Sequence, residues 1–338
     1  MKPYKYLLLL IILLGNGSIN AFAQANIVQK IDSLIVNYNK LGNFNGNILV
    51  AKDNHIIYES SLGYTDATKT NKLTLDYKFN IGSITKEFSA VALAQLEGQG
   101  RLNLSDKVSK YMPEFPLWAN QVRIKNLLDY TSGIPDVNWK QINGDKDILA
   151  GLLVIDSLDF APGTTYDYNN NNLFLRQLIV EKISKTPFKA YTEQFIFKPC
   201  DMSTAVMTPI ENEDNIAKGF STELKEDKKD LPITGGTYLT VLDLYKWSKC
   251  LYQKKLIKKR QILKLGKAFD LEDTQSALGN TIFKSNNLIK HVHDGRAGSY
   301  EALLVSNLNQ NWTIILLSNS HTGKLFEISD KITQILNY

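Results

Sequence analysis

The sequence predicts an α+β fold in which one antiparallel sheet is built from both chain ends, flanked by helices, with an inserted mainly helical lobe. Two observations predict it: strand-like pairs lie near both ends of the chain, and the long stretch between them has helical punctuation. We therefore assign 24–82 and 266–338 to an α/β lobe and 83–265 to the helical lobe. Together they form one domain.

The first lobe is predicted to open with a helix and a hairpin. Apolar residues recur at helical spacing from Ile27 to Leu41. Two β-branched and aromatic runs follow, Gly46–Ala51 and His55–Tyr64. The intervening Lys52–Asn54 contains Asp and Asn, which tolerate turn conformations, so these runs are expected to form a hairpin.

The last part of the chain repeats this pattern. Ala302–Asn307 and Trp312–Asn319 are strand-like and joined by four residues, and an amphipathic helix is expected over Lys324–Leu336. Between the two β-rich ends, helices are separated by glycine and proline. These positions are Gly98, Gly100, Pro113, Pro116, Pro135, Pro162 and Pro187.

Composition excludes several classes of protein. The chain has 338 residues, 43% apolar and 22% charged, which is too much hydrophobic material for a disordered protein. The net charge of +5 comes from 39 Lys and Arg against 34 acids, yet only five of the bases are Arg. Because Arg is the residue of bidentate phosphate recognition, we predict no nucleic-acid partner.

Residues 1–23 are predicted to be a signal peptide. Lys2 and Lys5 precede the apolar run Leu7–Leu14, and a polar break then leads to Ala21–Ala23, which fits a cleavage site. Eight apolar residues are too few to span a bilayer. We expect export to a bacterial periplasm or the medium, cleavage near Ala23, and no stable membrane anchor.

Few residues are available for metal ligation or disulfides. Cys200 and Cys250 could form a single disulfide, but we favour two buried thiols that pack as small hydrophobes. His291, His293 and Asp294 could suggest metal ligands, because alternate side chains share one face of a strand. Only two other histidines, His55 and His321, exist in the chain, so we predict no metal site.

A candidate nucleophile lies at the start of an apolar helix. Ser83 and Lys86 form the only SxxK in the chain, and on a helix these two side chains share a face. The helix N-terminus favours negative charge at the serine, and burial lowers the pKa of a lysine. About two SxxK matches are expected by chance, so the tetrad alone is not specific.

Two further motifs follow in order. Tyr168–Asn170 is the only YxN; it follows Pro162-Gly163 and precedes a helix expected near Asn172. His293–Gly295 lies just before the terminal strand pair. His321–Gly323 also matches HxG, but it follows the last strand, and we therefore favour His293.

Together these motifs resemble the serine β-lactamase and penicillin-binding-protein superfamily, in the branch of class C β-lactamases, D-Ala-D-Ala carboxypeptidases and related esterases. The resemblance runs from about Phe44 to Asn319, and its stretches include Phe79–Lys86, Gly100–Asp106, Leu127–Ile134 and Ile196–Met202. It implies a β-lactamase/transpeptidase-like fold and a serine hydrolase that needs neither metal nor cofactor.

The resemblance implies a role for each motif residue. Ser83 would be the acylated nucleophile, while Lys86 and Tyr168 would share general acid and base duty. A phenol with a pKa near 10 must have that pKa lowered to serve as a base, and an adjacent cation such as Lys86 can lower it. Asn170 would hydrogen-bond Lys86 and the substrate amide.

The third motif would supply a strand edge. His293 would line this edge opposite Tyr168, on the same strand as Gly295. The backbone N–H groups of Ser83 and Arg296 would form the oxyanion hole. Many β-lactamases have Lys-Thr-Gly in place of the third motif, and an imidazole offers less positive charge near neutral pH than an ammonium does.

Two other positions also depart from the family pattern. Tyr130 stands where His is common, and we expect it to be neutral for the chemistry. Cys200 stands where Leu is common, and we expect it to pack in the core. No effect is predicted for Asp294.

The predicted function is an exported serine hydrolase acting through an acyl-enzyme on Ser83. A D-Ala-D-Ala carboxypeptidase-like peptidase or a small esterase is favoured because of His293. The alternatives are a class C-like β-lactamase and a non-catalytic protein of the same fold that binds cell-wall peptide. The substrate would be a D-amino-acid peptide, an ester or a β-lactam; the sequence leaves open which of them, and also the oligomeric state.

Overall fold

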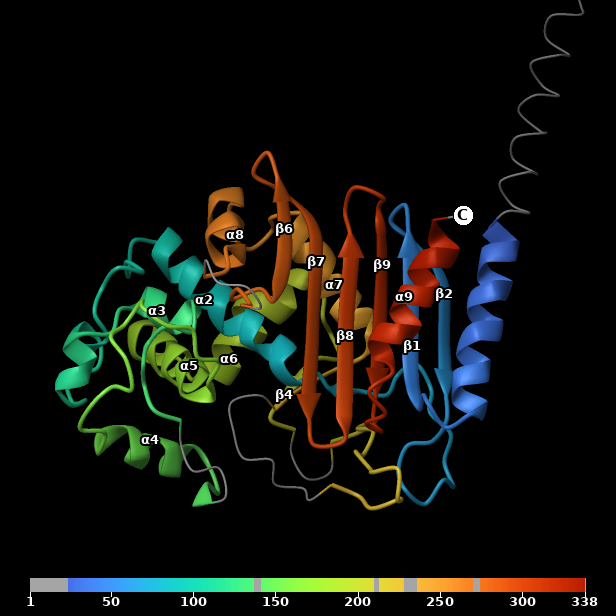
Figure 1. Ribbon diagram of the computed structural model, residues 1–338, viewed down its shortest axis with the longest axis horizontal. Helices are drawn as coiled ribbons and strands as arrows, with labels where there is room; N and C mark the ends of the chain where they lie inside the picture. The colour runs from blue at the N-terminus through green and yellow to red at the C-terminus, as the bar shows by residue number, and fades with distance from the viewer. Residues whose placement is uncertain (1–23, 137–140, 210–212, 228–235, 270–273, 338) are drawn as a thin grey trace, which may run out of the picture.

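A six-stranded antiparallel sheet lies at the centre of the molecule, in the order β2-β1-β9-β8-β7-β6 (Figure 1). The computed structural model describes residues 24–136, 141–209, 213–227, 236–269 and 274–337. The strands are β1 (Gly46–Lys52), β2 (His55–Leu62), β6 (Asn280–Lys284), β7 (Asn287–Ala297), β8 (Tyr300–Asn307) and β9 (Trp312–Ser318). The predicted signal peptide lies outside the described residues, and in the described part no helix is long and apolar enough to cross a membrane.

The sheet joins the two ends of the chain, as predicted. β1 pairs with β9 along its whole length, from Gly46 opposite Ser318 to Lys52 opposite Trp312. The β1–β2 turn is formed by Asp53 and Asn54, whose φ angles of 52° and 65° are left-handed. Paired left-handed residues match the twist of a two-residue hairpin, and Asp and Asn accept them readily.

Each face of the sheet has its own hydrophobic core. Alternate strand residues such as Ile48, Val50 and Leu303 pack against a helix over 24–40 and α9 (Leu325–Leu336). Their neighbours Leu49, Leu304 and Ile315 belong to the larger core on the other face. This alternation follows from the two-residue period of a strand. The larger core also contains the helices α2 (Lys86–Gly98), α7 (Val241–Tyr252) and α8 (Lys259–Gly266).

The remaining helices gather beside β6 and β7, on the side of the sheet away from β2 (Figure 1). They are η2 (Val108–Lys110), η3 (Leu117–Asn120), α3 (Ile124–Leu128), α4 (Asp145–Leu153), α5 (Asn170–Ser184), α6 (Phe188–Thr192), η5 (Glu193–Phe197) and η6 (Lys198–Cys200). A second, three-stranded sheet contains β3 (Phe79–Asn80), β5 (Thr237–Leu239) and β4 (Val206–Met207), in that order. α2 packs against α5, and this contact brings the SxxK segment to the YxN segment.

The expectation of two free thiols is wrong, because Cys200 and Cys250 form a disulfide between the end of η6 and α7. Their Cα atoms are 5.5 Å apart, within the range that a disulfide spans. Both cysteines are buried, which agrees with the part of the prediction that placed them in the core. Because fifty positions separate them in the sequence, only the packing of α7 on the helical lobe brings them together.

Candidate active site

The candidate nucleophile lies on a turn that leads into a buried helix. Ser83 is half-buried on the 3₁₀ turn η1 (Gly82–Thr85), and Lys86 is the first residue of α2. Lys86 Nζ donates to Ser83 Oγ at 2.9 Å. The i, i+3 spacing therefore brings the amine to the hydroxyl, as the motif predicts.

Tyr168 reaches the same hydroxyl from the helical lobe. Its OH donates to Ser83 Oγ at 2.8 Å. The loop that carries Tyr168 is fixed by the asparagines after it: Asn169 Nδ2 donates to Ile134 O at 2.6 Å, and Asn171 Nδ2 donates to Pro135 O at 2.7 Å. Asn169 also caps α5 by accepting from the Asn171 N–H. The asparagine run therefore holds Tyr168 at a defined place above the serine.

The third motif lies within β7, a strand that the family resemblance implied and the residue patterns alone did not. The backbone of this strand contacts the backbone of the serine turn directly. A Cβ at Gly295 would lie 2.0 Å from Ile81 O and 2.9 Å from Ser83 N. On the other side Gly82, with a φ of 51°, faces Arg296 N. Glycine at both positions lets the backbones of the serine turn and of β7 approach closely, and the role of the Ser83 and Arg296 N–H groups as an oxyanion hole stays a prediction. The Arg296 side chain is exposed.

His293 is turned inward and bound to an acid that the motif analysis missed. Its ring is 2% exposed, and Nδ1 lies 2.5 Å from Glu87 Oε1. His291 Nε2 lies 2.9 Å from the same oxygen, and Trp247 Nε1 donates to Glu87 Oε2 at 2.6 Å. The Tyr252 hydroxyl lies 2.9 Å from His291 Nδ1. The one sequence feature that could have revealed this acid is the position of Glu87, directly before the apolar segment Phe88–Leu96.

Glu87 is held in its ionised form. Burial acts to raise its pKa, but the charges and hydrogen bonds of His291 and His293 outweigh burial, so the pKa lies well below 4.5. An ionised carboxylate only accepts hydrogen bonds, so both rings donate to it.

Glu87, His291 and His293 each offer one atom that could bind a metal, and these three atoms lie within 4.8 Å of one another. The hydrogen bonds already account for their approach, and we assign no metal. The metal alternative weighed from the sequence had named Asp294 rather than Glu87.

The other predicted residues lie around the serine with fewer contacts. Asn170 is the half-buried first residue of α5, and in the described part of the chain its side chain makes no hydrogen bond to Lys86. Its role toward a substrate remains a prediction. Asp294 is half-buried on β7, and its charge acts on the Tyr168 phenol. The alternative histidine, His321, lies between β9 and α9 and pairs with Glu301 at 3.5 Å.

The electrostatics of the site distinguish the two candidate bases. Burial lowers the pKa of Lys86 from 10.5 to about 8. Burial also raises the pKa of Tyr168 to about 12, although the residue as a whole is 36% exposed. The expectation that an adjacent cation lowers the Tyr168 pKa is therefore wrong, because loss of water outweighs the neighbouring charges. Near neutral pH Lys86 can accept a proton, whereas Tyr168 keeps its own.

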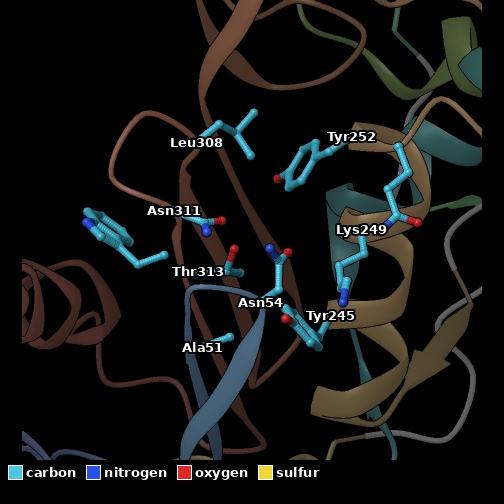
Figure 2. Close-up of a pocket in the computed structure, with 10 residues that line it drawn as sticks. Ala51, Asn54, Tyr245, Lys249, Tyr252, Leu308, Asn311 and Thr313 are labelled. Atoms are coloured by element: carbon cyan, nitrogen blue, oxygen red, sulfur yellow. The ribbon is translucent and has the colours of Figure 1, made fainter. Parts of the chain in front are cut away.

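A separate pocket lies near Tyr252, where α7 faces the β1–β2 and β8–β9 turns (Figure 2). Asn54 and Asn311 come from these turns, and Tyr245 and Lys249 come from α7. Its volume is about 80 Å³, far below the few hundred Å³ of ordinary ligand sites. None of the predicted site residues lines it, so we place no ligand there.

Known proteins are similar to this chain over nearly its whole length. The family model described as Beta-lactamase matches residues 31–335. The putative penicillin-binding protein PbpX of Bacillus subtilis (strain 168) is 28% identical over 319 residues, which cover 90% of this chain and 78% of that protein. The penicillin-binding protein from Bacillus halodurans superposes with a TM-score of 0.78 at 22% identity, covering 90% of this chain and 98% of that one.

A class C β-lactamase superposes equally well, with a TM-score of 0.78 at 18% identity over 93% of this chain and 96% of that one. At these identities the structural likeness shows the fold, and the family model shows the family. The match also spans the three motifs, which the fold brings to one place. The chain therefore belongs to the serine β-lactamase and penicillin-binding-protein superfamily.

Proposed function

We propose that this protein is a serine hydrolase that works through an acyl-enzyme on Ser83. One observation carries the proposal: a single half-buried hydroxyl oxygen accepts hydrogen bonds from both Lys86 Nζ and Tyr168 OH, at 2.9 and 2.8 Å. A nucleophile within reach of a base and of a proton donor is the arrangement that acyl transfer requires.

The steps follow from the protonation states. The neutral Lys86 amine accepts the Ser83 proton as Oγ attacks the substrate carbonyl carbon. The carbonyl oxygen becomes an oxyanion facing the backbone N–H groups of Ser83 and Arg296. The carbonyl–leaving-group bond then breaks, and the leaving group takes a proton through Tyr168, which regains one from the Lys86 ammonium. Water attacks the acyl-enzyme by the same route and restores Ser83.

Among acyl donors, a D-Ala-D-Ala-type peptide or a small ester is favoured over a β-lactam. His293 occupies the position where many β-lactamases have a lysine, and its ring is buried and bound to Glu87. The β7 edge therefore presents no lysine ammonium to a β-lactam carboxylate. Its only cationic side chain beside the motif is Arg296, which is exposed.

Intact-mass spectrometry during incubation with a penicillin, and separately with an activated ester, tests the proposal. We expect an adduct of the acyl mass on the peptide that contains Ser83, long-lived with the penicillin and short-lived with the ester. Rapid loss of the penicillin with only a fleeting adduct would identify a β-lactamase instead. Binding of wall peptide without an adduct from any donor would contradict the hydrolase and favour the binding protein.

Export is a second part of the proposal. The Cys200–Cys250 disulfide supports it, because disulfides persist in oxidising compartments and are rare in the cytosol. The intact mass of protein recovered from its own cells tests this point. A mass lacking residues 1–23 is expected, whereas a full-length protein recovered from the cytosol would contradict export.

The pH dependence of acylation should follow Lys86. The neutral amine is the reactive form, and with a pKa of about 8 about one tenth of the protein holds it at pH 7. Acylation by a neutral ester should therefore rise about ninefold from pH 6 to 7 and about fivefold from pH 7 to 8, and should level off above pH 9. Stopped-flow measurement of the acylation rate from pH 6 to 9.5 checks this. A rate that is flat over this range would exclude Lys86 as the base.

A further inference from the structure

Tyr130 packs against Tyr168, the proposed proton donor, and Arg176 packs against Tyr130. The Tyr130 ring is 4.7 Å from the Tyr168 ring, tilted by 35°. The Arg176 guanidinium carbon also lies 4.7 Å from the Tyr130 ring centroid. Lys86 Nζ lies 4.8 Å from the Tyr168 ring. Two aromatic rings in contact thus each have a cationic side chain within 4.8 Å of the ring centroid, and one of these cations is the proposed base.

Arg176 is a buried cation without an acidic partner. It is fully buried on α5, and its Nε donates to Leu127 O at 2.9 Å. Its Nη2 donates to Leu127 O and to Leu128 O, whereas Nη1 is buried and has no hydrogen-bond partner in the described chain. Among the described residues no carboxylate pairs with Arg176. Because a guanidinium stays charged at every ordinary pH, this buried charge is permanent.

The backbone at Tyr130 is arranged to hold the ring in this place. Tyr130 has a φ of 56°, in the left-handed region that non-glycine residues seldom occupy. Its carbonyl accepts the Asp167 N–H at 2.8 Å, one residue before Tyr168. Its ring also meets the Tyr166 ring edge-on at 5.9 Å. A strained conformation at a site is retained where the surrounding contacts fix it.

We propose that Tyr130 and Arg176 are positioning residues for the acyl transfer. The Tyr130 ring holds the Tyr168 ring over Lys86, and the permanent Arg176 charge opposes protonation of the Lys86 amine, so that a larger share of it is ready to accept the Ser83 proton. The proposal rests on the proposed function. It replaces the expectation that Tyr130 is neutral for the chemistry.

The charges around Lys86 agree with this role. Burial is the main cause of the lowered Lys86 pKa; Tyr130 acts against the lowering, and Arg176, with a smaller effect than Tyr130, adds to it. The groups that face this cluster from the surrounding elements are Tyr166, Tyr168, Asp129 and Asp294. Asp129 is paired with Lys125, and Asp294 acts on Tyr168. Arg176 is therefore the permanent positive charge behind the proposed base.

Arg176→Gln tests the role of the charge while it keeps a donor for Leu127 O. We expect its acylation profile to move up by about half to one pH unit, so that acylation falls about three- to tenfold at pH 7 and recovers near pH 9.5. Arg176→Lys keeps the charge and should retain the parent profile. Arg101→Met removes another arginine of the helical lobe and serves as the control. An equal loss at every pH, or a shift in Arg176→Lys as large as in Arg176→Gln, would overturn the proposal.

Tyr130→Leu tests the role of the ring. We expect kcat to fall about tenfold to a hundredfold, with KM changed much less, because Tyr168 loses the surface that positions it. Tyr130→Phe keeps the ring and should restore most of kcat. If Tyr130→Phe loses as much activity as Tyr130→Leu, the ring is not the cause.

A readout without turnover separates this proposal from the proposed function. NMR titration of Cε-labelled lysines gives the Lys86 pKa directly, with the resonance assigned by its absence from Lys86→Arg. The pKa should be higher in Arg176→Gln than in the parent. If the parent is not acylated by any donor, the proposed function fails. If the Lys86 pKa is the same in the parent and in Arg176→Gln, the present inference fails. If Arg176→Gln does not fold, Arg176→Lys replaces it, and a shifted Lys86 pKa in Arg176→Lys also overturns the inference.

Discussion

Ser83→Ala should form no acyl adduct and should lose turnover by about 10⁴-fold or more, the usual loss on removing a serine nucleophile. The substitution removes the one atom that accepts from both Lys86 and Tyr168. Because Ser83 is only half-buried and the substitution removes a single atom, the fold should change little, with a stability effect of about 1 kcal/mol or less. Hydrolysis of an activated ester, followed together with intact mass, measures both consequences.

Ser89→Ala is the matched control for this loss. Ser89 is a fully buried serine on α2, the helix that follows the Ser83 turn, and its hydroxyl donates to the Lys86 carbonyl within that helix. This variant should keep its adduct and most of its turnover. Two results would remove Ser83 from the mechanism: an adduct that persists in Ser83→Ala, or hydrolysis within tenfold of the parent.

The parts of the fold that could be predicted are those encoded locally. The β1–β2 hairpin is marked by Asp53 and Asn54, whose side chains accept the left-handed turn that the structure has. The approach of Lys86 to Ser83 follows from helical spacing alone. The approach of Tyr168 does not follow from spacing, and only the family resemblance predicted it.

The parts that could not be predicted depend on segments far apart in the sequence. Glu87 lies beside Lys86, but its function is defined by His291 and His293, about two hundred positions later. The Cys200–Cys250 disulfide likewise depends on how α7 packs. The sequence suggested a lowered Tyr168 pKa, but the pKa is raised. Burial, which depends on the whole fold, outweighs the nearby charges that the motif suggests.

Glu87→Ala should lower the free energy of unfolding by about 3–5 kcal/mol, the cost of breaking a buried charged group. The substitution leaves His291, His293 and Trp247 without their shared acceptor inside the core. Urea unfolding at pH 7 measures the loss. Glu97→Ala is the matched control on the same helix, because it breaks only a surface ion pair with Lys264 and should cost about 1 kcal/mol or less.

The contribution of Glu87 to the free energy of unfolding should decrease as the pH falls. The pKa of Glu87 is lowered by folding, so its contribution is fully present above the unfolded value of about 4.5 and is lost as pH falls through the folded value. The stability gap between the parent and Glu87→Gln, an isostere that cannot ionise, should therefore be widest near neutral pH and narrow below about pH 4.5. A gap that widened in acid, or a cost for Glu87→Ala no larger than that for Glu97→Ala, would contradict the ionised Glu87. Because His293 lies on the strand that meets the Ser83 turn, any Glu87→Ala protein that folds should also acylate more slowly than the Glu97→Ala control.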